Sequence, residues 1–141
     1  MSVPENPRAR RVQMASVGVV TMLILQFILG MIYNIYGTMP TAAKSVGMFS
    51  SVSLSLHVIL GILLVIAAIM QIVRSMQLHH RPAVILSWVG LVAILAAWGT
   101  GEAFIQKGAN GASLGMSLAF AVALACYVGC ILVLSPKPAE A

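Results

Sequence analysis

Among the polar side chains inside otherwise apolar stretches of the 141-residue chain, five could do chemistry together. They are Asn34, His57, Trp98, Glu102 and Ser117. A polar or ionisable residue inside a membrane span costs about 2.5–3.5 kcal/mol on insertion scales, so each one calls for a specific role. At about 1.5 Å of rise per helical residue, all five fall within about 10 Å of the outer ends of their predicted helices. We therefore predict one polar site in the outer leaflet.

His57 is the centre of this predicted site, and three interpretations of it stay open. An imidazole can bind haem iron or carry a proton, and in either role Glu102 or Asn34 would tune it. Gly61, one turn after His57, leaves space for a flat macrocycle or for a neighbouring helix. The third interpretation is structural: a pair of His57 and Glu102 holds the second and third helices together.

Other residues with ligand chemistry do not join this site. His79 and His80 lie about 33 Å along the helix from His57, so they cannot supply a second haem ligand within one subunit. Cys126 and Cys130 are one helical turn apart in an apolar stretch, where we expect small core residues rather than a disulfide. The chain has no phosphate-binding glycine loop, no Ser/His/Asp set and no paired carboxylates. We therefore predict neither a metal site nor a catalytic set.

The composition decides what kind of molecule must position these residues. Hydrophobic residues make up 60% of the chain and charged residues 8%, and the mean hydropathy is +1.01. Soluble domains are about 45–50% apolar and about 25% charged, so the composition excludes a soluble enzyme. The formal net charge of +5 is typical of some nucleic-acid-binding proteins, but here the basic residues flank apolar stretches. We predict an integral membrane protein that binds no nucleic acid.

Four stretches are long enough to cross a hydrocarbon layer of about 30 Å, which takes about 20 helical residues. We place these spans at 14–36, 52–73, 83–105 and 114–134, with disordered polar tails at 1–13 and 135–141. The short connections predict an all-α, up-down-up-down four-helix bundle. Six of the eight basic residues lie on one side of the spans, which predicts that both termini are cytoplasmic.

Small residues at every fourth position predict where the helices pack most closely, because close backbone approach favours helix contact in a bilayer. One such stripe belongs to the third span and another to the fourth. We expect these two spans to form the tightest helix pair, through Ala93, Ala97, Gly101, Ser117, Ala121, Ala125 and Gly129.

Three short motifs resemble a family of small bacterial four-helix membrane proteins of unknown function. They are Gly30-Met31-x-x-Asn34-x-Tyr36-x-x-x-Pro40, His57-x-x-x-Gly61 and Ala112-Ser113-Leu114-x-Met116, and the resemblance spans most of residues 20–134. It implies the four-span fold and the bacterial inner (plasma) membrane, and it carries no activity. The place of His57 on its helix is also loosely similar to b-type cytochrome subunits, although no second histidine stands at its depth.

These observations favour a non-catalytic accessory or interaction subunit. The first alternative is a membrane redox subunit linked to haem b or quinone, with His57 as the haem ligand. The second alternative is a proton-coupled transport component that uses His57 and Glu102. The expected partners are the lipid bilayer, other membrane subunits or a second copy of the chain.

Overall fold

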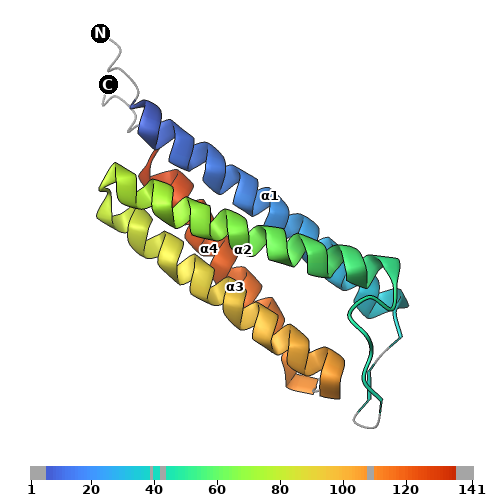
Figure 1. Cartoon of the computed structure of the whole chain (residues 1–141). Helices are drawn as coiled ribbons and strands as arrows, with labels where there is room; N and C mark the ends of the chain where they lie inside the picture. Colours follow the sequence, from blue (N-terminus) through green and yellow to red (C-terminus); the bar gives the residue numbers. More distant parts are fainter. Residues whose placement is uncertain (1–5, 39, 42–43, 108–109, 136–141) are drawn as a thin grey trace, which may run out of the picture.

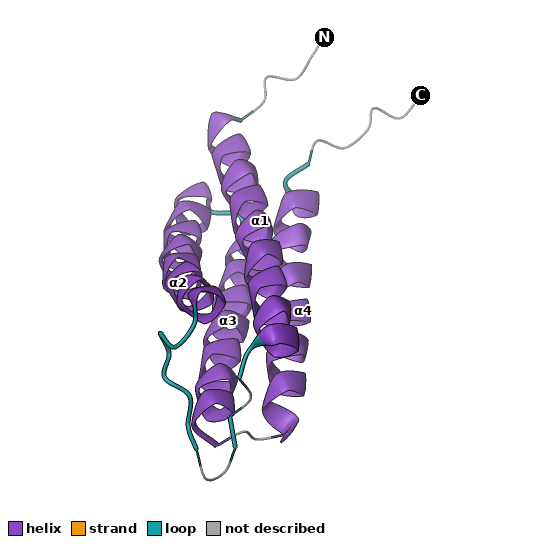
Figure 2. Ribbon diagram, turned by 90° about the vertical axis from the view of Figure 1, so that its right-hand side faces the viewer, coloured by secondary structure: helices purple, strands orange, loops and turns teal. Residues whose placement is uncertain are grey.

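A computed structural model of the chain describes residues 6–38, 40–41, 44–107 and 110–135. Four helices run through them: α1 (Pro7–Tyr36), α2 (Val52–Leu78), α3 (Arg81–Lys107) and α4 (Asn110–Val133). They alternate in direction, and each packs against two neighbours in a ring of the order α1, α2, α3, α4 (Figures 1 and 2). The described part of the chain is thus the up-down-up-down bundle that the sequence predicts.

The two ends of the bundle differ, and we name them by what lies there. At the terminal end, α1 begins, α4 finishes, and a turn at His79 and His80 joins α2 to α3. At the loop end, α1 is followed by the connection to α2, and α3 by α4. Figure 1 shows that the α1–α2 pair and the α3–α4 pair diverge toward the loop end.

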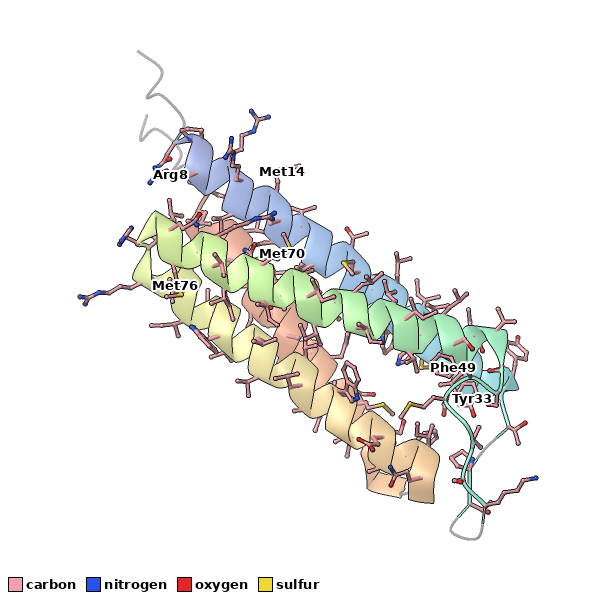
Figure 3. The ribbon with its side chains drawn as sticks, in the orientation of Figure 1. Arg8, Met14, Tyr33, Phe49, Met70 and Met76 are labelled. Carbon is pink, nitrogen blue, oxygen red and sulfur yellow. The ribbon has the colours of Figure 1, made fainter. Side chains whose placement is uncertain are left out.

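All four helices are long and apolar enough to cross a membrane. Their outward faces carry large hydrophobic side chains along the whole length of the bundle. Met14 is 62% exposed on α1, and Met70 and Met76 are about half exposed on α2 (Figure 3). Large contiguous apolar surfaces are rare on soluble monomers, so this outer surface is typical of helices that face lipid.

The helices extend beyond the predicted spans, most of all at the start of α1. The prediction that residues 1–13 form a disordered tail is wrong from Pro7 onward, because α1 begins there. Asn6 caps the helix by accepting a hydrogen bond from the Arg8 backbone N–H (3.0 Å), and Pro7 suits the first helical position. Residues 1–5 and 136–141 of the two predicted tails lie outside the described residues.

The turn between α2 and α3 is shorter than the sequence suggests, since α2 continues to Leu78 and α3 begins at Arg81. His79 makes this possible by adopting the left-handed conformation, with φ of 56°. Helices commonly end on a residue in this conformation, although glycine usually supplies it. His79 therefore carries backbone strain that a glycine would not.

The most extensive helix pair is α3–α4, as predicted, but its contact face on α4 is not the predicted stripe. Ser117, Ala121 and Ala125 are exposed, whereas Ala123 is only 1% exposed and packs in the core of the bundle. The reason is geometric: positions four apart drift by about 40° around a helix of 3.6 residues per turn. At the end of the stripe, Gly129 does lie against α3, where it faces the side chain of Leu86.

Below the loop end, the centre of the bundle is an apolar core to which all four helices contribute. Its buried members include the side chains Val19, Leu23, Leu64, Ala68, Ile72, Leu91, Ala93, Ile94, Ala123 and Tyr127. A smaller cluster of Tyr33, Leu54 and Ile105 closes part of the loop end. Between these two apolar clusters the helices leave a cavity.

Candidate ligand-binding site

The cavity has a volume of about 220 Å³ and is lined by residues of all four helices. Its floor, on the side of the central core, is apolar and includes Leu23, Leu64, Ile94, Phe120 and Ala123. Its polar lining residues stand nearer the loop end, where Figure 3 labels Tyr33. The cavity is therefore amphipathic along the axis of the bundle.

All five residues of the predicted polar site line this cavity: Asn34, His57, Trp98, Glu102 and Ser117. They differ in how far they are enclosed. His57 is half-buried, while Asn34, Glu102 and Ser117 are exposed and Trp98 is 43% exposed. His57 thus stands inside the cavity, and the other four residues form its rim.

His57 holds α2 against α1. Its Nδ1 lies 3.0 Å from the backbone carbonyl oxygen of Gln26. A carbonyl oxygen only accepts hydrogen bonds, so Nδ1 must carry a proton and donate it. The approach depends on Gly30, because a Cβ there would lie 3.1 Å from His57 Cε1 and 3.4 Å from Nδ1.

This hydrogen bond fixes the chemistry of the other ring nitrogen. In a neutral imidazole with the proton on Nδ1, Nε2 carries a lone pair and can only accept a hydrogen bond or bind a metal. No described residue hydrogen-bonds Nε2, and it is not among the fully enclosed polar atoms without a partner in the described part of the chain. Because His57 lines the cavity, this lone pair is available to a ligand there.

Gln26, whose backbone carbonyl accepts the hydrogen bond from His57, also lines the cavity. Its Oε1 is enclosed and has no hydrogen-bond partner within the described residues. Its Nε2 packs over Gly61, where a Cβ would come within 3.2 Å of it. The space that Gly61 leaves therefore admits a polar side chain of the neighbouring helix, which is one of the two roles that the sequence suggested for this glycine.

The structural interpretation required Glu102 to pair with His57, but Glu102 has a different partner. Its Oε1 accepts a hydrogen bond from Gln106 Nε2 (2.8 Å), one turn along α3. No hydrogen bond or ion pair joins it to His57, whose Nδ1 is occupied by Gln26. His57 therefore links α2 to α1 by a hydrogen bond, and Glu102 stays at the rim on α3.

Ser117, at the rim, contributes little directed polarity toward the interior. The Ser117 hydroxyl donates to the backbone oxygen of Ser113 (3.0 Å), which occupies its one proton. On the apolar side, Phe27 of α1 stacks on Phe120 of α4, with ring centroids 4.8 Å apart. His57 and Gln26 are thus the polar groups best placed to orient a molecule in the cavity.

Sequence reasoning missed a second set of polar residues, which lies at the terminal end and is fully buried. Gln71 Nε2 donates to Ser16 Oγ (2.6 Å) and to the Val12 carbonyl oxygen (3.1 Å). Ser75 and Ser87 hydrogen-bond to each other at 3.0 Å. The apolar core separates this Ser–Gln cluster (Ser16, Gln71, Ser75, Ser87) from the cavity. Single serines in apolar spans are ordinary, so only the packing reveals the cluster.

We compared the chain with models of protein families, with curated proteins and with solved structures, and none of the three comparisons found a match.

Proposed function

We propose that the protein is a small membrane subunit that binds a lipid-soluble, amphiphilic ligand in the cavity at the loop end. The observation that carries this proposal is the arrangement of the cavity, with an apolar floor and a half-buried histidine below a polar rim. Ligand sites are typically concave and mostly apolar, with a few polar groups that fix orientation. Phe27, Met31 and Trp98 line the cavity and are 41–43% exposed, so it opens between the helices.

The size of the cavity favours a single ring over a macrocycle. A cavity of about 150 Å³ accommodates benzene, and sites for drug-sized ligands measure about 300–1,000 Å³. The 220 Å³ here suits one substituted ring whose tail continues between the helices into lipid. Haem b with His57 as its ligand remains a prediction, and the Nε2 lone pair supports it, but this volume supports it less.

Proton-coupled transport through His57 and Glu102 also remains a prediction, with less support than ligand binding. A proton pathway needs polar groups across the whole bundle, whereas the apolar core separates the cavity from the Ser–Gln cluster. Ligand binding without a catalytic set is compatible with the accessory role, and the partner is then another membrane subunit or a second copy of the chain.

We further propose the plasma membrane of a bacterium, with the terminal end of the bundle in the cytoplasm. The family resemblance supports the location, and the positions of Arg8, Arg10, Arg11, Arg74 and Arg81 near the terminal end support the orientation. Cysteine labelling of intact cells with a membrane-impermeant maleimide tests the orientation.

Two exposed positions suit this labelling, one at each end: Ser50 in the connection at the loop end and Gln77 near the terminal end of α2. The native Cys126 and Cys130 are buried and give little background. We expect Ser50→Cys to react and Gln77→Cys not to react. The reverse pattern would overturn the orientation.

The ligand proposal is tested with a ring-brominated octylphenol, because bromine on a bound ring quenches a nearby tryptophan. The chain has two tryptophans, and of these Trp98 lines the cavity and Trp88 does not. In nanodiscs, the Trp88→Phe protein should show saturable quenching of Trp98. The Trp98→Phe protein reports only the unsaturable background from probe dissolved in the lipid.

Two neighbouring alanines of α4 provide a matched pair of variants. Ala119 lines the cavity, whereas Ala121 is exposed and does not line it. In the Trp88→Phe background, Ala119→Phe should fill the cavity and weaken the binding of the probe about tenfold or more, while Ala121→Phe should leave it unchanged. Unsaturable quenching, or equal affinity of the two variants, would refute the proposed function.

A further inference from the structure

The cavity lining includes two polar side chains with hydrogen-bonding capacity that no described residue uses, His57 and Gln26. In the neutral imidazole of His57, Nε2 carries a lone pair, because the one ring proton is on Nδ1, which donates it to the Gln26 backbone carbonyl. The enclosed Oε1 of Gln26, an acceptor, has no hydrogen-bond partner among the described residues, and its Nε2 packs over Gly61. Gln26 thus contributes both the carbonyl that orients the imidazole and a side-chain amide in the lining of the same cavity.

A hydroxyl group matches the lone pair of His57 Nε2, and a carbonyl or ether oxygen does not. A hydroxyl donates its proton to the lone pair of His57 Nε2. A carbonyl or ether oxygen has only lone pairs, so it would face the lone pair of Nε2. Moving the imidazole proton to Nε2 would relieve this repulsion, but it would break the 3.0 Å hydrogen bond to α1.

We propose that the ligand is a phenol-type amphiphile, of the hydroquinone class, and that His57 selects its ring hydroxyl. This inference rests on the proposed function and names the chemistry that the same site recognises. The 220 Å³ volume accommodates one ring, and the stacked Phe27 and Phe120 belong to the apolar lining beneath the polar atoms. A quinone, which has carbonyl groups in place of the hydroxyls, is expected to bind more weakly than its quinol.

Three probes that differ at one substituent test this selection without any redox chemistry. They are the ring-brominated octylphenol, its methyl ether, and the parent octylbromobenzene that lacks the oxygen. Quenching of Trp98 in the Trp88→Phe protein in nanodiscs gives the dissociation constant of each. We expect the phenol to bind about tenfold more tightly than either other probe, because only the phenol gives a proton to Nε2.

Two variants then assign the preference to its residue. In His57→Leu, which retains an apolar side chain of similar size, the three probes should bind with dissociation constants within about twofold of each other. In Ala121→Phe, at an exposed position away from the cavity, the tenfold preference should persist. If His57→Leu does not fold, the comparison of the three probes on the Trp88→Phe protein still decides whether the site selects a hydroxyl.

The outcomes separate the two proposals. Saturable binding of all three probes with equal affinity would refute the selection of a hydroxyl and leave the ligand-binding function intact. A preference for the phenol that survives in His57→Leu would refute the role of His57. Failure of every probe to bind saturably would refute the proposed function itself.

Discussion

The contact between Gly30 and His57 gives a prediction that can be worked out from the structure. Gly30 lies inside α1, and a Cβ there would come within 3.1 Å of His57 Cε1 and 3.4 Å of Nδ1. In Gly30→Ala the imidazole must therefore move by a few tenths of an ångström. The movement strains the 3.0 Å hydrogen bond from Nδ1 to the Gln26 carbonyl oxygen.

Two effects on the free energy of unfolding oppose each other in this variant. Alanine is favoured over glycine by about 0.8–1.0 kcal/mol inside a helix. A strained or lost hydrogen bond costs about 0.5–1.5 kcal/mol. We therefore expect Gly30→Ala to leave the stability within about 1 kcal/mol of the wild type, since the two effects nearly cancel.

Gly18 is the matched control because it lies on the same helix and a Cβ there would meet nothing within 4 Å. Gly18→Ala should show the full increase in the free energy of unfolding that the helix preference of alanine gives in a mixed micelle. We expect the free energy of unfolding of Gly30→Ala to be about 1 kcal/mol lower than that of Gly18→Ala. The assay is equilibrium unfolding by SDS in mixed micelles, followed by far-UV circular dichroism.

A double-mutant cycle isolates the contact from other effects of the substitution. In a His57→Ala background nothing remains for the new methyl group to displace, so Gly30→Ala should gain as much as Gly18→Ala. If the two glycine substitutions are equally stabilising while His57 is present, the imidazole does not pack on α1 and the description of the site is wrong.

Three further predictions concern the rest of the bundle, and the same unfolding assay measures each. Gln71→Ala should cost about 2–4 kcal/mol through lost packing and hydrogen bonds. Gln71→Met should stay within about 1 kcal/mol of the wild type, because it also removes the enclosed, unpartnered Oε1; an equal cost for both variants would contradict this. Gly90→Ala should cost about 1–3 kcal/mol, since its Cβ would lie 2.8 Å from the fully buried ring of Tyr127. Gly99→Ala, with nothing within 4 Å, is its control, and similar results for the two would show that α3 and α4 pack less closely. His79→Gly should gain about 0.5–1 kcal/mol by relieving the left-handed backbone, and His79→Val should lose stability; the opposite order would place the strain elsewhere.

The fold was largely predictable from the sequence because hydrophobicity and length determine which segments can span a bilayer. The predicted end of the first span at Tyr36 and the predicted start of the second at Val52 agree with the ends of α1 and α2. The start of α1 was not predictable from hydropathy, because its first turns are rich in arginine. Asn6 and Pro7 start the helix there through capping and backbone geometry.

The sequence predicted how deep the residues of the candidate site lie along the bundle, but not the direction in which their side chains point. A fixed rise per residue sets the depth of each side chain, and the five predicted polar residues do line one cavity. The direction of a side chain around its helix depends on tertiary packing. His57 turns toward α1 because Gly30 leaves room for the imidazole and the Gln26 carbonyl accepts its proton. The same limit explains why the predicted stripe on α4 missed most of the contact face.

The central claim is that His57 offers an unprotonated Nε2 to a ligand in the cavity, and nitrogen NMR of the imidazole tests it most directly. The chain contains three histidines, so ¹⁵N-labelled histidine gives few signals, and His57→Leu identifies the relevant one. At neutral pH we predict that the His57 proton is on Nδ1. The Nε2 resonance should shift when the octylphenol is added and stay in place when its methyl ether is added. A proton on Nε2, or no shift at a saturating concentration of the phenol, would contradict the account.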